Sequence, residues 1–520
     1  MPTHKSLLSS NKIVTLTVAL LALLVGLFLM SFNNPPSLDD GLRHIAMAKA
    51  MLENGLYSSG FAWNNFFYEG YFADHIVDPW YGADLAYIPF ASLPIVTALK
   101  AFIFSSIVLL MIAFWYVIKP MKLPPAWIAI LLSILILGDQ LFLSRLMLGR
   151  PYVLMTAVTL ITLKGILERR YLLTALSLAV AVLVSNLFVF PLFIALLGCI
   201  WMWTTSSGLK GACRMGIAII VGTAVGLLLH PQTIEYAVHT FDVFLRIPIM
   251  KDLQVGMELY SGVFTSTSAT ALLGVIILFS FICFSIKPRV QISEWHKEGI
   301  TFLCFLVIIF LIAFFVWMRA LDFLWPLEII LLAMLIKAEP QKAEVLFTEK
   351  HYKETKKNKF QITGKFVALI LIALLASNFY LAINSITKGD GHRSLEMFDT
   401  LNLIPPDSHV LNLEWDIIPP LIAVRPDLKY ATGVVSTYTY LDDPKVHRLL
   451  RTASASPVEF DVSLIDGEKW SERILAQYPS DYIVLSESRF PQFIYNLRGV
   501  ESLRELSESG AVIAVFKIVE

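Results

Sequence analysis

Long hydrophobic runs, separated by shorter polar segments, dominate this chain. An α-helix rises about 1.5 Å per residue, so about 20 apolar residues cross the roughly 30 Å hydrocarbon layer of a membrane. The runs predict about eleven membrane-spanning helices, at residues 13–32, 94–118, 124–141, 151–167, 171–187, 188–204, 213–230, 266–286, 299–317, 321–337 and 365–385. We therefore expect a polytopic α-helical membrane protein.

The positive charges predict how these helices are oriented. With the amino terminus in the cytoplasm, twenty Lys and Arg side chains fall in or beside the inner loops and seven fall in the outer loops. Cytoplasmic loops of membrane proteins carry the excess of Lys and Arg. We therefore expect a cytoplasmic amino terminus and an extracytoplasmic carboxy terminus.

Three segments on the predicted outer side are longer than turns. Residues 33–92 form a long first outer loop, and residues 230–265 form a second, with the pattern of a short helix lying on the membrane surface. Residues 1–390 are then a helical bundle. In residues 391–520, strand-like runs such as His409–Leu413, Asp481–Leu485 and Ala511–Ile518 alternate with helical ones, which predicts an extracytoplasmic α/β domain.

The composition limits the function classes. Hydrophobic residues make up 56% of the 520 residues and charged residues 16%, so a large part of the surface needs lipid to cover it. The 41 Lys and Arg balance the 41 Asp and Glu, which gives a nucleic acid no electrostatic attraction to the whole chain. The four cysteines have no CxxC spacing, and we expect neither disulfides nor structural zinc.

The pair Asp39–Asp40 follows the first hydrophobic run, at the start of a helical pattern from Leu38 to Leu52. In a structural interpretation Ser37 caps the helix, and the two carboxylates complement the helix dipole. In a functional interpretation Asp40 and His44, four residues apart, share a helix face at the membrane surface. A carboxylate there could accept the proton of an acceptor hydroxyl.

Further acidic and histidine residues lie in the same loop. Asp74 and His75 follow a run of aromatic residues, which are common at membrane interfaces. Together with Asp40 and His44 they could hold a divalent cation such as Mg²⁺ or Mn²⁺, because carboxylates and imidazoles are suitable ligands. A metal is therefore a possible cofactor.

Three arginines, Arg145, Arg150 and Arg319, lie at the predicted outer ends of helices. Arginine is suited to bidentate phosphate binding, so a phosphate-bearing ligand is expected at this level. The alternative is that these side chains only fix the depth of their helices in the membrane.

Taken together, these features resemble the GT-C superfamily of membrane glycosyltransferases, which includes protein O-mannosyltransferases, oligosaccharyltransferases and lipid A aminoarabinose transferases. The resemblance rests on the Asp39–Asp40 pair in a long first outer loop, the many hydrophobic runs and the carboxy-terminal domain. Residues 413–420, with 430–433 and 440–444, are similar to bacterial members of the group.

The resemblance implies transfer of a sugar from a polyprenyl-phosphate carrier in the cytoplasmic (inner) membrane to an extracytoplasmic glycan, lipid or protein. Asp40 or Asp39 would act as the base or orient the acceptor. Arg150 and Arg319 would bind the carrier phosphate, with Arg145, His44, Asp74 and His75 as further substrate-binding candidates. A transporter or flippase of a lipid-linked anion, or a non-catalytic membrane scaffold, are the alternatives.

Overall fold

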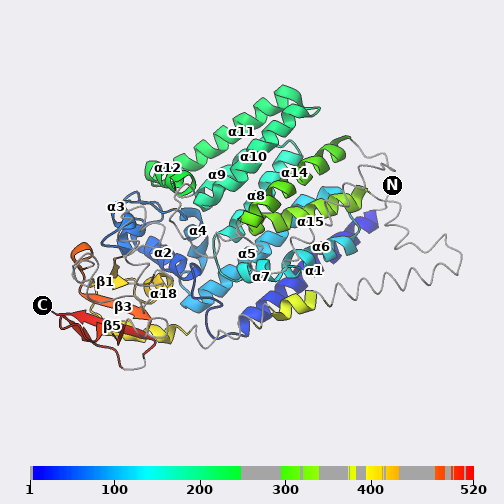
Figure 1. The fold of residues 1–520 in the computed structure, drawn as a ribbon. Helices are drawn as coiled ribbons and strands as arrows, with labels where there is room; N and C mark the ends of the chain where they lie inside the picture. The colour runs from blue at the N-terminus through cyan, green and yellow to red at the C-terminus, as the bar shows by residue number, and fades with distance from the viewer. Residues whose placement is uncertain are drawn as a thin grey trace.

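The computed structural model contains a helical bundle with a small β-sheet at one end (Figure 1). It describes residues 4–246, 294–316, 320–338, 375–381, 394–412, 417–431, 475–486, 497–508 and 511–519, together with residues 373, 384, 414, 494 and 495. The two chain ends lie at opposite ends of the molecule, with the carboxy terminus beside the sheet (Figure 1).

The bundle helices coincide with most of the hydrophobic runs. They are α1 (His4–Met30), α5 (Ile95–Ile118), α6 (Pro125–Leu137), α7 (Gln140–Leu146), α8 (Tyr152–Leu167), α9 (Tyr171–Val184), α10 (Val189–Thr204), α11 (Gly208–Leu229), α14 (Glu294–Val316) and α15 (Leu321–Ala338). Proline at the start of a helix lacks an N–H that would in any case be unsatisfied there, and α6 begins in this way at Pro125.

Four described helices are long and apolar enough to cross a membrane, namely Ile95–Met121, Asn186–Thr204, Gly208–Leu229 and Lys297–Phe315. The bent pair α6 and α7 makes a fifth if the two form one span. The predicted number of about eleven is therefore not confirmed. The helices α8 and α9 are shorter than a full span, while the run 266–286 and most of 365–385 lie outside the described residues.

The bend between α6 and α7 measures 75° and has a local cause. The Asp139 carboxylate accepts a hydrogen bond from the Phe142 N–H at 2.8 Å, which caps the new helix α7. At Gly138 a Cβ atom would lie 2.5 Å from the Ile134 carbonyl oxygen and 2.7 Å from the Trp325 ring, so a larger residue would collide there. The chain therefore turns where glycine precedes a helix cap.

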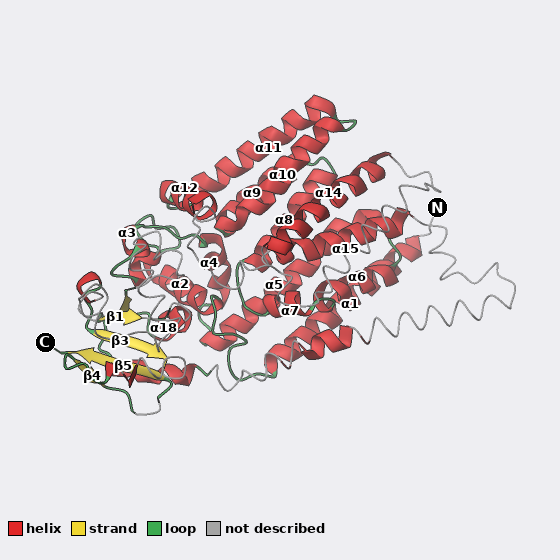
Figure 2. Ribbon diagram, viewed as in Figure 1, coloured by secondary structure: helices red, strands yellow, loops and turns green. Residues whose placement is uncertain are grey.

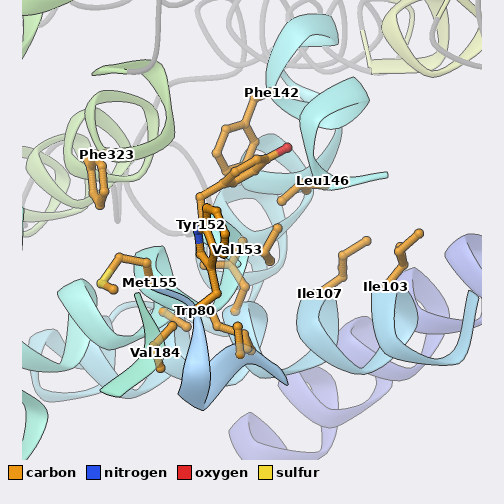
Figure 3. Packing of buried hydrophobic residues seen from close by; sticks show 14 of the residues in the cluster. Trp80, Ile103, Ile107, Phe142, Leu146, Tyr152, Val153, Met155, Val184 and Phe323 are labelled. Carbon is orange, nitrogen blue, oxygen red and sulfur yellow. The ribbon is translucent and has the colours of Figure 1, made fainter. Parts of the chain in front are cut away.

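Much of the molecule shares one hydrophobic cluster, which runs from the bundle helices to the sheet end. Figure 3 shows part of it, to which α7 contributes Phe142, α8 contributes Tyr152 and α15 contributes Phe323. Because interiors pack at the density of organic crystals, these side chains hold the helices at fixed distances.

The predicted first outer loop is largely helical. It contains α2 (Gly41–Asn54), η1 (Trp63–Phe66), α3 (Tyr71–Asp74), α4 (Tyr81–Tyr87) and η2 (Ile88–Phe90). The helix predicted from Leu38 is confirmed as α2, but it begins at Gly41, so Ser37 is not its cap. Asp40 occupies the N-cap position with helical backbone angles and makes no side-chain cap bond.

The second predicted outer segment begins with a helix, α12 (Thr233–Phe241), followed by a π-helical turn at Asp242–Arg246. Tyr236 and His239 are buried against the molecule, whereas Ile234, Val238 and Phe241 are exposed. The short amphipathic helix predicted in this segment is therefore present. Residues 247–265 lie outside the described residues.

The sheet at the end of the bundle has five strands in the order β2-β1-β3-β5-β4 (Figure 2). The strands are β1 (His409–Asn412), β2 (Lys429–Tyr430), β3 (Tyr482–Ser486), β4 (Leu503–Glu505) and β5 (Ile513–Ile518). The first three pair in parallel and the other pairs are antiparallel. Parallel strands need a crossover, and α18 (Ile418–Val424) supplies it between β1 and β2.

The three predicted strand runs are thus confirmed as β1, β3 and β5. The predicted helical run Gly467–Gln477 falls mostly outside the described residues. The domain division at residue 391 stays a prediction, because residues 385–393 also lie outside them.

The sheet is attached to the segment that follows α2. Phe67 forms a parallel bridge with Tyr430, and the Tyr68 N–H donates to the Tyr430 carbonyl at 3.2 Å. The Tyr68 ring stacks on His409 with 4.2 Å between centroids. Because α18 also lies against α2, the carboxy-terminal residues help to hold the helix that begins after Asp40.

A buried ion pair joins α7 to α15. Arg145 donates from Nε and Nη2 to the two carboxylate oxygens of Asp322, both at 2.7 Å, and both side chains are almost fully buried. The guanidinium also lies 4.5 Å from the centre of the Tyr152 ring. A bidentate pair of this kind fixes the relative position of two helices.

Substitution Asp322→Asn should destabilise the protein by about 3–5 kcal/mol, because it leaves the buried Arg145 charge without its carboxylate. Unfolding of the purified protein in detergent measures this loss. Glu505→Gln is the matched control, since Glu505 pairs with the partly exposed Arg498 and such pairs contribute less than about 1 kcal/mol. Equal losses in the two variants would contradict the structural role of the buried pair.

Candidate active site

Asp39, Asp40 and Arg150 form a charged cluster where α2 and α8 begin. Arg150 donates from Nη2 to Asp39 Oδ1 at 2.8 Å and from Nε to Asp39 Oδ2 at 3.0 Å. The Asp40 carboxylate lies 3.4 Å from Arg150 Nε. All three side chains are partly exposed, at 23%, 22% and 17% respectively. The cluster can therefore meet a ligand.

The turn before Arg150 places its side chain against α2. Gly149 has a φ of +68°, which residues with a Cβ rarely adopt. A Cβ there would also lie 2.5 Å from Leu99 Cδ1. The Tyr87 hydroxyl donates to the Gly149 carbonyl oxygen at 2.5 Å, which fixes this turn to the last residue of α4.

Arg43 supplies a second positive charge beneath the cluster. Its Nη2 lies 3.3 Å from Asp40 Oδ2, and the side chain is only 1% exposed. The guanidinium carbon lies 4.1 Å from the centre of the Trp80 ring and 5.4 Å from that of Trp63. Among the described residues, its Nε and Nη1 have no hydrogen-bond partner. Cation–π contacts therefore replace part of the hydration that Arg43 loses.

His44 lies on α2 behind this cluster and not on its surface. Its Nδ1 lies 2.5 Å from Asp84 Oδ1, and both side chains are fully buried. Burial lowers the pKa of His44 well below its ordinary value, and the neighbouring Arg43 charge lowers it further. His44 is therefore neutral near pH 7.

A second buried carboxyl, Asp78, lies next to Asp84. Its Oδ1 accepts hydrogen bonds from Trp63 Nε1 and from the Trp80 N–H, both at 3.0 Å. Burial raises the pKa of Asp78 to about 6, although these donors oppose the rise. The pKa of Asp84 is raised well above its ordinary value by burial and then by Asp78, with which it shares a hydrogen bond. Asp84 therefore keeps its proton more readily than Asp78 does.

The other predicted site residues lie elsewhere. Arg145 is paired with Asp322. Asp74 is exposed at the end of α3, and His75 Nδ1 lies 2.9 Å from the Tyr71 carbonyl oxygen. Arg319 lies outside the described residues. The structure thus brings together Asp39, Asp40 and Arg150 out of the predicted set.

The predicted metal ligands do not gather at one point. Within the part of the chain that the structure describes, no group of three or more His, Cys, Asp or Glu side chains could hold a metal ion. Of the four candidates, Asp40 faces Arg43 and Arg150, His44 faces Asp84, and Asp74 and His75 lie at α3. Among the described residues, the four candidates therefore do not form one metal site.

Sequence reasoning did not find Arg43, Asp78 and Asp84 as parts of this site. Asp78 and Asp84 stand among aromatic residues in the first loop, a pattern that is also typical of a membrane interface. Arg43 is one turn from Asp39 and Asp40, and this spacing could have indicated it. The signal that could have indicated Asp78 and Asp84 is the position of two carboxylates within an apolar segment, where burial makes an ionised group costly.

No family model and no curated protein matches the chain. Solved structures, in contrast, match over almost its whole length. The apo oligosaccharyltransferase of Archaeoglobus fulgidus is similar with a TM-score of 0.59 and 11% identity, over 90% of this chain and 69% of that one. An arabinofuranosyltransferase from Mycobacteria, AftD, matches 97% of this chain and 40% of its own, with a TM-score of 0.53 and 12% identity.

A third structure matches over almost the full length of both chains. ArnT from Cupriavidus metallidurans, solved bound to undecaprenyl phosphate, covers 97% of each chain with a TM-score of 0.52 and 12% identity. At such identities the likeness concerns the fold. All three proteins are GT-C glycosyltransferases, and the present chain therefore has a GT-C-like fold.

Proposed function

We propose that this protein is an integral membrane glycosyltransferase that moves a sugar from a polyprenyl-phosphate carrier in the bilayer to an acceptor hydroxyl or amide. The observation that carries the proposal is the partly exposed cluster of Asp39, Asp40 and Arg150, which combines two carboxylates with a guanidinium, a group suited to phosphate. The fold supports it, because ArnT was solved with undecaprenyl phosphate and the archaeal enzyme AglB with a dolichol-phosphate.

Asp40 is the base in this proposal, and Asp39 positions Arg150. Both oxygens of Asp39 are occupied by the Arg150 guanidinium, and Oδ1 also accepts from the Asp40 N–H at 2.7 Å. These donors hold the Asp39 carboxylate in position. Asp40 contacts Arg43 and Arg150 at 3.3 and 3.4 Å and is 22% exposed, so an acceptor can approach this carboxylate from solvent.

The reaction is a displacement at the anomeric carbon. Asp40 takes the acceptor proton as the acceptor atom bonds to the anomeric carbon, and the bond from that carbon to the phosphate oxygen breaks. Configuration at the carbon is inverted. Arg150 lies beside Asp40 and neutralises the charge that grows on the departing phosphate. The predicted phosphate contact of Arg319, which lies outside the described residues, belongs to the same step.

The acceptor class stays open between a glycan, a lipid and a protein. The lipid carrier lies in the bilayer. In this proposal the cluster lies at the extracytoplasmic face of the inner membrane, as the distribution of Lys and Arg predicts. No step passes through a metal, because the described residues do not bring three ligand side chains together.

Substitution Asp40→Asn should lower turnover by at least about 100-fold, because an amide cannot accept the acceptor proton. Release of labelled sugar from polyprenyl-phosphate donors by the purified protein measures this change. Asp39→Asn should cost less in turnover and more in donor affinity. Asp407→Asn is the control, since Asp407 is exposed in a turn with φ of 59°, which Asn tolerates. Wild-type turnover in Asp40→Asn would exclude the base role.

Substitution Arg150→Lys keeps the positive charge but loses the bidentate hydrogen-bonding geometry of the guanidinium. It should raise the KM for the lipid-linked donor by about 10-fold, the effect of a lost charge-assisted hydrogen bond of about 1.5 kcal/mol. Steady-state kinetics with increasing donor test this expectation. Arg498→Lys is the matched control, because Arg498 forms an ion pair in the terminal sheet. An unchanged KM in Arg150→Lys would remove the phosphate role.

A further inference from the structure

A chain of buried polar groups leads away from the active site, from His44 through Asp84 to Asp78 and Trp63. We propose that His44, Asp84 and Asp78 form a proton relay that removes the proton from Asp40 after each transfer and holds it on Asp78. This inference rests on the proposed function, because it assumes that Asp40 accepts the proton of the acceptor.

The hydrogen-bond pattern determines where the protons lie at rest. Asp78 Oδ1 already accepts from Trp63 and from the Trp80 N–H. If both carboxyls were ionised, Oδ2 of Asp78 and Oδ2 of Asp84 would each be buried without a donor. One proton on Asp84 Oδ2, donated to Asp78 Oδ2, satisfies both atoms. Asp84 Oδ1 then accepts from His44 Nδ1–H.

The charge balance of the buried groups supports the same assignment. Arg43 is a buried cation, and it interacts electrostatically with both Asp78 and Asp84. One guanidinium neutralises one carboxylate, and a second buried negative charge would cost several kcal/mol. A single proton kept by the acid pair leaves Arg43 and the pair neutral together. Two carboxyls that share a site in this way rarely ionise together.

The assignment leaves one open position at the start of the chain. With its proton on Nδ1, His44 presents a lone pair on Nε2, and this atom has no hydrogen-bond partner among the described residues. His44 lies one helical turn after Asp40, and the Asp40 charge acts on its ring. Nε2 therefore offers a buried acceptor on the residue one helical turn after the proposed base.

Three proton transfers move the charge of one proton from Asp40 to Asp78. Asp40 gives its proton to His44 Nε2, directly or through one water. As that N–H bond forms, the Nδ1 proton passes to Asp84 Oδ1, and the Oδ2 proton of Asp84 passes to Asp78 Oδ2. Asp40 is again a carboxylate, and Asp78 becomes a neutral acid. No imidazolium persists next to Arg43, where burial and that charge disfavour it.

Storage of the proton away from the reacting atoms has a chemical consequence. The reverse reaction needs a protonated Asp40 to donate to the newly formed linkage. While the proton is on Asp78, that donor is missing and the product can leave. The same transfers in the opposite direction return the proton to water in the emptied site.

The substitution Asp84→Asn separates a relay from a structural role. Asparagine at this position still accepts from His44 Nδ1–H through Oδ1 and still donates to Asp78 Oδ2 through its amide. Every hydrogen bond of the chain is kept, but no proton can pass. A purely structural role therefore predicts wild-type kinetics.

The relay predicts that Asp84→Asn lowers kcat by about 100-fold, leaves the KM for the lipid-linked donor unchanged, and unfolds at the wild-type temperature. The solvent isotope effect on turnover should also change. His44→Asn, which keeps a donor at the Nδ1 position but has no second nitrogen, should show the same loss of kcat. Asp407→Asn is the control. Wild-type kcat in Asp84→Asn would overturn the relay.

An infrared measurement tests the resting proton on Asp84 without any turnover. Difference spectra of wild type against Asp84→Asn at pH 7 should contain the carbonyl stretch of a protonated carboxylic acid, and the spectra of wild type against Asp407→Asn should not. Absence of this band would overturn the relay whatever the enzyme does. If the carboxylic-acid band is present but the protein releases no sugar, the proposed reaction is contradicted, whereas the protonated Asp78–Asp84 pair is still supported.

Discussion

The contact between Arg150 and Asp39 is the interaction on which the arrangement of the candidate active site depends. It joins residues that are 111 positions apart and brings the start of α8 against the start of α2. Both ends of this contact are partly exposed, so a ligand can compete for the guanidinium. The tight turn at Gly149 and the hydroxyl of Tyr87 maintain it from one side, while α18 supports α2 from the other. The site is thus held by the bundle and by the terminal sheet.

Behind this contact the protein balances charge in a small buried volume. Arg43 lies against the rings of Trp63 and Trp80 and next to Asp40, and its charge acts on the Asp78 and Asp84 carboxyls. Each charge by itself would be costly away from water. Their combination is tolerated because opposite charges and aromatic faces offset one another. The same balance makes the group sensitive to any substitution that changes its charge.

The sequence allowed much of the fold to be predicted, because hydrophobic runs report directly on helices that face lipid or one another. It also indicated Asp39, Asp40 and Arg150, since these residue types are unusual at the ends of apolar helices. It did not separate Arg150 from Arg145, which has the same setting in the chain. The difference lies in tertiary partners, Asp39 in one case and Asp322 in the other. Likewise, His44 has its partner 40 residues away, which local spacing cannot reveal.

The attachment of the first loop to the sheet has a consequence for association between molecules. A strand at the edge of a sheet exposes unpaired backbone groups that can recruit a strand from another chain. At the β2 edge, Phe67 and Tyr68 already pair with Tyr430, and the Lys429 ammonium donates to the Asn65 carbonyl oxygen. The segment that follows α2 therefore also covers backbone groups at this edge, which leaves fewer of them open to intermolecular β-pairing.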